Sequence, residues 1–326
     1  MKLFKLCLTS IFLSCVITPT AVAETIELKF GHVGAPGSLF AVSAEEFAKR
    51  ANAKLAGKAK VVVYGSSQLG KDKELLQKLK LGTVDFALPS TVMSSESDLF
   101  GLFEMPYLVK DRNHMQRIEE AMFWSKLAPS VEPKGIKILA VWENGFRQIT
   151  NNKRPIKVPD DLKGVKLRTP KGEWRVKMFK AYGANPSPMS LSEVFTALQT
   201  GVMDGQENPL IQIYSQKFQE VQKYLSMSGH VYTPAYVTVG TKKWKKLPKD
   251  VRKILEQTAK ETQSFVYTSA ANFDNELLGK MKASGIQINE VDKQAFIDAS
   301  KPIYDQFGMQ VKGGKKLVDK AFALAK

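Results

Sequence analysis

Cysteine and histidine are scarce in this sequence, which has two cysteines and three histidines among 326 residues. Both cysteines, Cys7 and Cys15, lie within the first 23 residues. A chain that has lost those residues cannot use a cysteine nucleophile, a thiolate metal site or a disulfide. The histidines His32, His114 and His230 have no second ligand at the spacing of a metal-binding motif. We therefore expect no metal site.

The short motifs of common enzyme classes are also absent. There is no Gly-x-Gly-x-x-Gly, no Walker lysine loop and no Gly-x-Ser-x-Gly elbow. The sequence therefore lacks the usual signatures of nucleotide-cofactor binding and of α/β-hydrolase catalysis. Glycoside cleavage by a pair of carboxylates stays an alternative at this point, because the distance between the two groups is set by the tertiary structure. We expect a protein that is not an enzyme and carries no cofactor.

Long apolar runs are missing except at the start of the chain. Two lysines precede an apolar run over residues 6–17, and the small residues Ala21 and Ala23 follow. The run is too short to span a membrane, so residues 1–23 are predicted to be a secretory signal peptide. We expect cleavage after Ala23 and export to the periplasm. A lipid anchor at Cys15 is the alternative, since the residues before it weakly resemble a lipobox.

Acidic residues are outnumbered, 32 against 48 lysines and arginines, which gives a formal charge of +16. Loss of residues 1–23 removes two lysines and no acid, so the charge falls from +16 to +14. Such a basic chain would ordinarily suggest nucleic acid binding. The predicted export argues against that partner, and we expect none. The densest basic run, Lys242 to Lys246, is interpreted as a solvated helix start, with a docking patch for a membrane partner or anionic lipid as the alternative.

Apolar periodicity predicts a two-lobed α/β protein. In the first half, strands are expected at 26–30, 61–64 and 84–88, with helices at 38–56 and 72–81. Alternation of strand and helix is typical of a parallel, doubly wound sheet whose ligand crevice lies at the carboxyl ends of the strands. Later, helices are expected at 112–128, 173–182 and 190–200, and strands at 136–142, 146–150, 165–168, 202–206 and 236–240.

A long helix is predicted over residues 248–284, because Pro248 suits a first turn and no other proline or glycine interrupts the pattern before Gly279. Roughly 35 residues give a helix of about 50 Å, longer than one domain is wide. We expect it to brace both lobes. Lobe I is predicted to comprise residues 24–145 plus about 235–270, and lobe II residues 146–234 plus about 271–326.

Four sequence blocks point to one family when their order and spacing are taken together. They are residues 145–150 (GFRQIT), 159–168 (PDDLKGVKLR), 183–186 (GANP) and 193–209 (EVFTALQTGVMDGQENP). The combination resembles, over essentially the whole chain after residue 23, the extracytoplasmic substrate-binding proteins of TRAP (tripartite ATP-independent periplasmic) transporters. That family includes receptors for dicarboxylates and sialic acid.

The resemblance implies a periplasmic-binding-protein-like α/β fold, with two doubly wound sheets joined by hinge strands and spanned by the long helix. It also implies capture of an organic anion and delivery to TRAP membrane subunits. A sensory receptor coupled to a kinase would share the same motifs and is the alternative. The acid itself stays open among sugar acids, dicarboxylates, and aromatic or keto acids, and we expect a monomer.

Arg168 closes the predicted strand 165–168, and its planar guanidinium can hold a carboxylate through two parallel hydrogen bonds. The resemblance implies that role, and pairing with a protein carboxylate such as Glu207 is the alternative. Arg147 lies in the Gly-x-Arg motif, for which the resemblance implies a second contact to the ligand acid. Surface exposure or a structural ion pair is the alternative for Arg147.

The resemblance implies further contacts with the ligand. Asn208 is expected to bind the ligand, and the alternative is that it stabilises the turn before the next proline. Asp72 is expected to bind hydroxyl groups of the ligand, and the alternative is that it caps the start of a helix. Ser90 and Leu191 stand where the sialic acid branch has an acid and an aromatic residue, which argues against sialic acid itself. His32 is expected in the pocket, with the core as its alternative.

Overall fold

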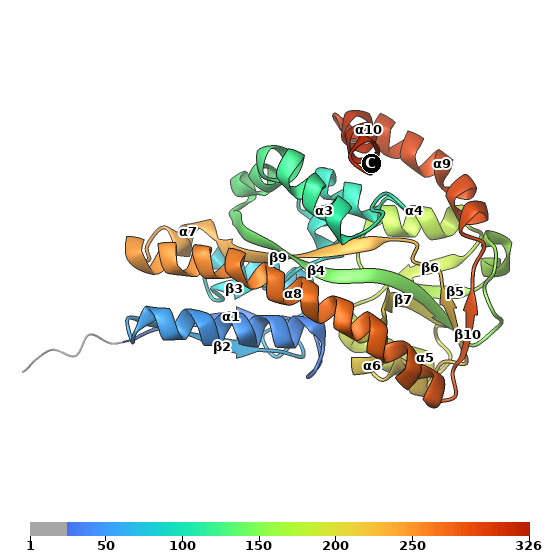
Figure 1. Cartoon of the computed structure of the whole chain (residues 1–326), viewed down its shortest axis with the longest axis horizontal. Helices are drawn as coiled ribbons and strands as arrows, with labels where there is room; N and C mark the ends of the chain where they lie inside the picture. Colours follow the sequence, from blue (N-terminus) through green and yellow to red (C-terminus); the bar gives the residue numbers. More distant parts are fainter. Residues whose placement is uncertain (1–24) are drawn as a thin grey trace, which may run out of the picture.

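A mixed β-sheet runs through both halves of the molecule (Figure 1). The computed structural model describes residues 25–326, so the predicted signal peptide and its cleavage site lie outside the described residues. The strand order is β2-β1-β3-β9-β4-β7-β5-β6, with β8 paired to β4 and β10 paired to β8. The strands are β1 (Ile26–Gly31), β2 (Ala59–Tyr64), β3 (Phe86–Ala87), β4 (Ile136–Asn151), β5 (Lys166–Thr169), β6 (Asn185–Pro188), β7 (Gly205–Pro209), β8 (Tyr224–Met227), β9 (Tyr232–Gly240) and β10 (Gln287–Glu290).

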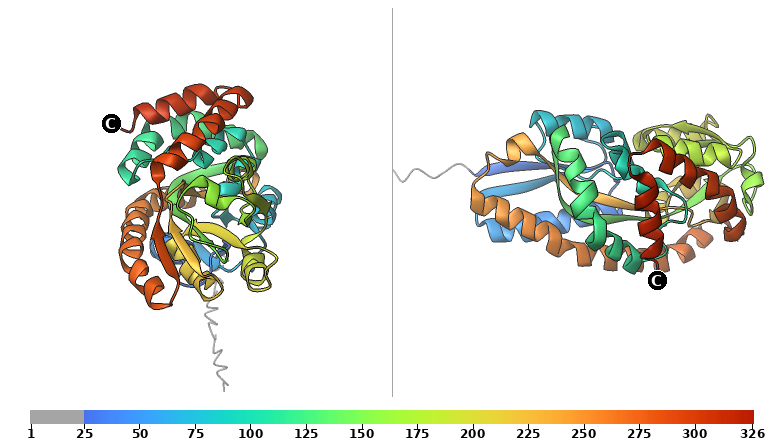
Figure 2. Two further views of the ribbon diagram at one scale, coloured as in Figure 1. Left: turned by 90° about the vertical axis from the view of Figure 1, so that its right-hand side faces the viewer. Right: turned by 90° about the horizontal axis from the view of Figure 1, so that it is seen from above.

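Helices cover both faces of this sheet (Figures 1 and 2). The α-helices are α1 (Leu39–Leu55), α2 (Asp72–Leu81), α3 (Arg112–Ile118), α4 (Glu173–Ala181), α5 (Val194–Gln199), α6 (Leu210–Ser215), α7 (Thr241–Trp244), α8 (Lys249–Ala283), α9 (Lys293–Gln310) and α10 (Gly314–Ala323). The predicted helix 112–128 is α3 followed by the π-helical segment η3 (Glu119–Leu127). Among the described residues, no helix combines the length and the apolar character that a membrane span needs.

The first lobe confirms the predicted parallel unit. β1 pairs in parallel with both β2 and β3. α1 begins after Ser38, whose hydroxyl accepts a hydrogen bond from the third residue of the helix at 3.2 Å. Phe30, Phe47 and Phe86 meet between α1 and the sheet with ring centroids 5.5 to 5.7 Å apart. This aromatic core fixes the sheet edge from which the first wall of the site extends.

Two long strands pass between the lobes. The sequence predicts separate strands at 136–142 and 146–150, but the structure has one strand, β4, that pairs antiparallel with β9. The pairing register shifts between Glu143 and Gly145, and Gly145 has a φ of +123°. Glycine tolerates that conformation. Residues that look like a strand end in the sequence therefore form a bulge, and the strand continues through it.

The second lobe contains a shorter parallel unit, in which β5 pairs in parallel with β6 and β7. The strand predicted at 202–206 is β7, three residues later. Val202 is 54% exposed, whereas all of β7 is buried. At Gly205 a Cβ atom would stand 2.3 Å from the carbonyl oxygen of Thr150, so the close approach of β7 to β4 requires glycine there.

α8 confirms the predicted long helix. Its 35 residues extend about 52 Å at the usual rise, and it packs against α1 and β4 at one end and α6 at the other (Figure 1). The indole nitrogen of Trp142 donates to the carbonyl oxygen of Ala259 at 2.9 Å, which ties the first half of α8 to the hinge strand β4. The helix is therefore a shared brace for both lobes.

The chain ends in a helical hairpin, α9 and α10, on the side of the sheet opposite α1 (Figure 2). α9 packs against α4, while α10 packs against η2 (Asp98–Glu104) and bonds to α3. The ring nitrogen Nε2 of His114 lies 2.8 Å from the carbonyl oxygen of Ala321. The division into lobes stays a prediction, and α10 contacts residues that it assigns to lobe I.

Candidate functional site

A cavity of about 690 Å³, including its open mouth, lies between the two lobes. Its first wall comes from the start of α2 and the turn after β3, and its second from the end of β5 and the segment before α5. β4 and β7 supply polar residues at its base. Six of the seven sequence-predicted residues line it: Asp72, Ser90, Arg147, Arg168, Leu191 and Asn208.

Arg168 is held at the end of β5, where it pairs in register with Ser187 of β6 and Gln206 of β7. Its Nε and Nη2 atoms donate to the carbonyl oxygen of Met189 at 2.9 and 2.6 Å. The residue is only 3% exposed, and burial lowers its pKa to about 10, so it remains charged at neutral pH. Within residues 25–326 no carboxylate lies within 4.0 Å of it; the salt bridges of that part of the chain do not include Arg168.

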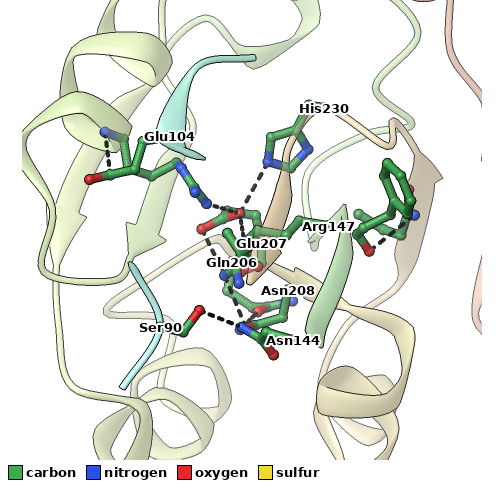
Figure 3. A network of polar contacts seen from close by, with 12 residues as sticks. Ser90, Glu104, Asn144, Arg147, Gln206, Glu207, Asn208 and His230 are labelled. Carbon is green, nitrogen blue, oxygen red and sulfur yellow. Dashed lines mark hydrogen bonds and ion pairs between the residues drawn. The ribbon is translucent and has the colours of Figure 1, made fainter. Parts of the chain in front are cut away.

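Arg147 lines the cavity and also forms the structural ion pair that its sequence context left open (Figure 3). Its Nε and Nη2 atoms donate to the Glu207 carboxylate, the latter at 3.0 Å. Nη2 also donates to Oδ1 of Asn208 at 3.0 Å. Antiparallel pairing of β4 with β7 brings these residues together. Glu207 is thus the partner of Arg147 and does not pair with Arg168.

Glu207 is the centre of a buried charge cluster (Figure 3). Its Oε2 atom accepts from Nη1 of Arg175 at 2.7 Å and lies 3.1 Å from Nε2 of His230. Burial opposes ionisation, but the charges of Arg147 and Arg175 prevail and hold the pKa of Glu207 well below its usual range. Burial lowers the pKa of His230 to about 4, so that ring is neutral at pH 7. Glu207 therefore contacts two guanidinium groups, and the buried carboxyl group of Glu104 lies beside them, where its Oε2 atom accepts from the backbone N–H of Arg175 at 3.0 Å.

Hydrogen-bond acceptors without partners border the same cavity. Asn144 and Gln212 line it, and the side-chain oxygen of each is buried without a hydrogen-bond partner. Nδ2 of Asn144 donates to the hydroxyl of Ser90 at 3.3 Å, and that hydroxyl donates to the carbonyl oxygen of Pro234 at 2.7 Å. Because buried polar atoms are normally paired, a turn of either amide group toward the cavity would let its oxygen accept a hydrogen bond from a ligand donor.

The mouth of the cavity is spanned by an ion pair. Nζ of Lys71, just before α2, donates to Oε1 of Glu193 in the other lobe at 2.8 Å. Asp72 follows at the first position of α2, as the helix-start alternative predicted, and it faces the cavity as well. Burial raises the pKa of Asp72 to about 6, although the charge of Arg168 acts in the opposite direction. The two walls are therefore in contact, as expected for a closed cleft.

His32 is not among the residues that line the cavity. It is 2% exposed, and its Nδ1 atom accepts a hydrogen bond from the backbone N–H of Gly34 at 3.2 Å. The ring also packs against Gly65, where an added Cβ would approach it to 2.9 Å. Burial lowers the pKa of His32 to about 4. The structure places His32 in the core next to the first wall.

This burial predicts how His32 contributes to acid sensitivity. Between its ordinary pKa of 6.5 and the folded value of about 4, the unfolded chain binds the proton and the folded chain does not, so stability falls as pH falls. The free energy of unfolding of the wild type, minus that of His32→Asn, should decline across this range and stay constant above it. Urea unfolding of both proteins at several pH values measures the difference. Parallel curves would show that the folded chain accepts the proton freely.

Sequence reasoning missed three features of the site. Arg175 lies in a predicted helix with no motif around it, and the sequence around His230 likewise carries no motif. Asn144 precedes the recognised block at 145–150 by one residue. Only the tertiary structure brings these side chains to Glu207 and the cavity. No group of three or more His, Cys, Asp or Glu in residues 25–326 is arranged to hold a metal ion.

Two lobes are joined by hinge strands, and the cleft between them holds a buried arginine with no carboxylate within 4.0 Å among residues 25–326. This arrangement suits the binding of a small anion. A family model for the bacterial extracellular solute-binding proteins, family 7, matches residues 30–310. The chain belongs to this family, as its resemblance to the TRAP substrate-binding proteins predicted.

Relatives match over nearly the full length of the chain. The 2,3-diketo-L-gulonate-binding periplasmic protein of Escherichia coli is 32% identical over 294 residues, covering 89% of this chain and 90% of that protein. A TRAP periplasmic solute-binding protein from Sulfurospirillum deleyianum with bound succinate has 36% identity and a TM-score of 0.88, covering 92% and 99% of the two chains. One from Polaromonas bound to D-erythronate has 31% identity and a TM-score of 0.87, covering 91% and 98%.

Proposed function

We propose that this protein captures a hydroxylated organic acid in the inter-lobe cleft, with Arg168 as the anchor of the carboxylate, and delivers it to the membrane subunits of a TRAP transporter. The observation that carries the proposal is the buried guanidinium of Arg168, which has two hydrogen bonds to a carbonyl group and no carboxylate partner in residues 25–326. A buried charge of this kind favours an anionic partner. Family membership supports transport as the purpose of the capture.

The remaining residues have distinct proposed roles. Arg147 and Asn208, which are bonded to each other, present a second polar edge to the carboxylate. Asp72 and Ser90 face the rest of the ligand from the first wall, and Leu191 packs against its carbon chain from the second. A ligand that touches both walls stabilises the closed form selectively, so binding shifts the population toward closure about β4 and β9.

The unpaired oxygens of Asn144 and Gln212 support a ligand with hydroxyl groups rather than a second carboxylate. A second carboxylate brings only acceptors, and Asp72 would repel it whenever both are ionised, whereas Lys71, Lys73 and Lys171, which also line the cavity, would attract it. Among the relatives, one structure holds D-erythronate, a hydroxylated four-carbon acid, and another holds succinate, a four-carbon dicarboxylate. The cavity of this chain is better matched to the first chemistry.

Matched four-carbon acids test the proposal. We expect D-erythronate to bind more tightly than succinate, and butyrate to bind most weakly, because only the first supplies donors to the unpaired oxygens. Calorimetry on the mature chain gives the affinities, and a thermal-shift screen checks them, since a ligand at 100 times its Kd adds about 2.7 kcal/mol of stability. Tighter binding of succinate would contradict the hydroxylated class alone. Failure of every organic acid to bind would contradict the function itself.

The setting of this function is also proposed. We infer a periplasmic protein that is released by cleavage after Ala23 and acts as a monomer. The family is periplasmic by its relatives' names, and the apolar run at residues 6–17 supports export. Intact-mass measurement of the secreted protein locates the cleavage site, and analytical ultracentrifugation gives the oligomeric state.

A further inference from the structure

A second hollow lies on the outside of the molecule, where α10 packs near η2 and η3. Its volume is about 710 Å³, including the space open to solvent. We call it the lysine hollow, and it is lined by Leu99, Met122, Lys126, Lys312, Gly313, Lys316, Leu317 and Lys320. None of these residues lines the inter-lobe cavity. Any role of the lysine hollow is therefore separate from capture of the acid.

The charge in the lysine hollow has one sign. Four lysines line it and no acidic residue does. In the described part of the chain, none of the four forms an ion pair within 4.0 Å, and Lys320 donates instead to the carbonyl oxygen of Ala121 at 2.9 Å. Lys315, which does not line the hollow, pairs instead with Asp319 at 2.9 Å. The lysines that line the hollow therefore keep unneutralised charge, whereas their neighbour on the same helix is paired.

The lysines are also spaced regularly around an apolar floor. Lys316 and Lys320 are four residues apart on α10, about 6 Å along its axis, and Lys312 lies in the chain just before the helix starts. Lys126 stands on the opposite wall, in η3, and Leu99, Met122 and Leu317 lie between the walls. Glutamates four residues apart on another helix have the same spacing as Lys316 and Lys320.

We propose that the lysine hollow docks an acidic amphipathic helix of a protein partner. The carboxylates of that helix would face the lysines of α10 and η3, and an apolar side chain between them would contact the floor formed by Leu99, Met122 and Leu317. A flat lipid surface matches the same charge, but it cannot reach a concave floor. Charge complementarity and shape together therefore favour a narrow helical segment.

A designed peptide serves as the probe. It carries glutamates at every fourth position with leucines between them on the same face, and a scrambled peptide of identical composition is the control. Fluorescence anisotropy with the mature chain should show binding of the first peptide that weakens with salt. The variant Lys126→Glu/Lys316→Glu should weaken it about tenfold or more, because it reverses one charge on each wall. Neither lysine forms a side-chain hydrogen bond or ion pair in residues 25–326, so the fold should tolerate the change.

A matched charge change elsewhere separates docking from general attraction. Lys245→Glu/Lys246→Glu makes the same change in the basic run before α8 and should leave peptide affinity within about twofold. Equal losses in the two variants, equal binding of the scrambled peptide, or no binding would overturn the proposal. Binding to mixed phosphatidylglycerol and phosphatidylcholine vesicles through Lys126 and Lys316, without binding of the peptide, would assign the hollow to a membrane instead. Affinity for the organic acid should be unchanged in both variants.

Discussion

Replacing Arg168 with alanine is expected to weaken binding of the organic acid by about two to three decades or more. Removing one partner of a buried ion pair costs roughly 3–5 kcal/mol, and each factor of ten in affinity corresponds to about 1.4 kcal/mol. No other guanidinium in the cavity is free of a protein carboxylate, since Arg147 is paired with Glu207. Calorimetric titration of the wild type and Arg168→Ala with the same acid measures the loss.

Arg168→Lys is the matched control for charge. Lysine keeps the positive charge but cannot form two parallel bonds to a carboxylate while also bonding to the carbonyl oxygen of Met189. Its affinity should fall between those of the wild type and Arg168→Ala. Circular dichroism and the Tm without ligand verify that both variants are folded. Unchanged affinity in folded Arg168→Ala would remove the anchor from the account.

Replacing Glu207 with glutamine is expected to lower the free energy of unfolding by about 3–5 kcal/mol. The substitution preserves size but leaves Arg147 and Arg175 buried without the carboxylate that both contact. Two nitrogen atoms of Arg175, Nε and Nη2, have no hydrogen-bond partner within residues 25–326, so loss of the carboxylate adds to polar groups that are already unpaired there. Urea or guanidinium unfolding of the wild type and Glu207→Gln measures the difference.

Glu193→Gln is the control for this variant, because Glu193 forms an exposed ion pair with Lys71. Exposed pairs contribute little, so its unfolding free energy should be almost that of the wild type. The pKa of Glu207 is held low, so its contribution to stability is present above the ordinary carboxyl pKa and is lost as pH falls below it. A loss in Glu207→Gln no larger than that in Glu193→Gln would contradict the role of the cluster.

The parts of the fold that could be predicted are those with strong local periodicity. The parallel unit of β1, β2 and β3 and the uninterrupted helix α8 repeat one pattern over many residues. β6 (Asn185–Pro188) was not predicted, because it contains two prolines and has no buried residue. α9 was not predicted either, and it contains Pro302 in its interior. In these segments tertiary pairing and packing override local signals.

The candidate site was predictable through its motifs but not through its network. Arg147, Arg168 and Asn208 lie in the sequence blocks that carry the family resemblance, and the structure brings them to one cavity. Arg175 and His230 come from segments without such blocks, and only the folded chain places them on Glu207. A residue whose role depends on a partner far along the chain leaves no local pattern.

The most direct test of the account is a crystal structure of the mature chain with the organic acid that binds it most tightly. We expect the ligand carboxylate within hydrogen-bond distance of the Arg168 guanidinium, with Asp72 facing the same molecule from the first wall of the cleft and Arg147 from its base. A bound acid that lies outside this cleft, or one whose carboxylate is turned away from Arg168, would contradict it.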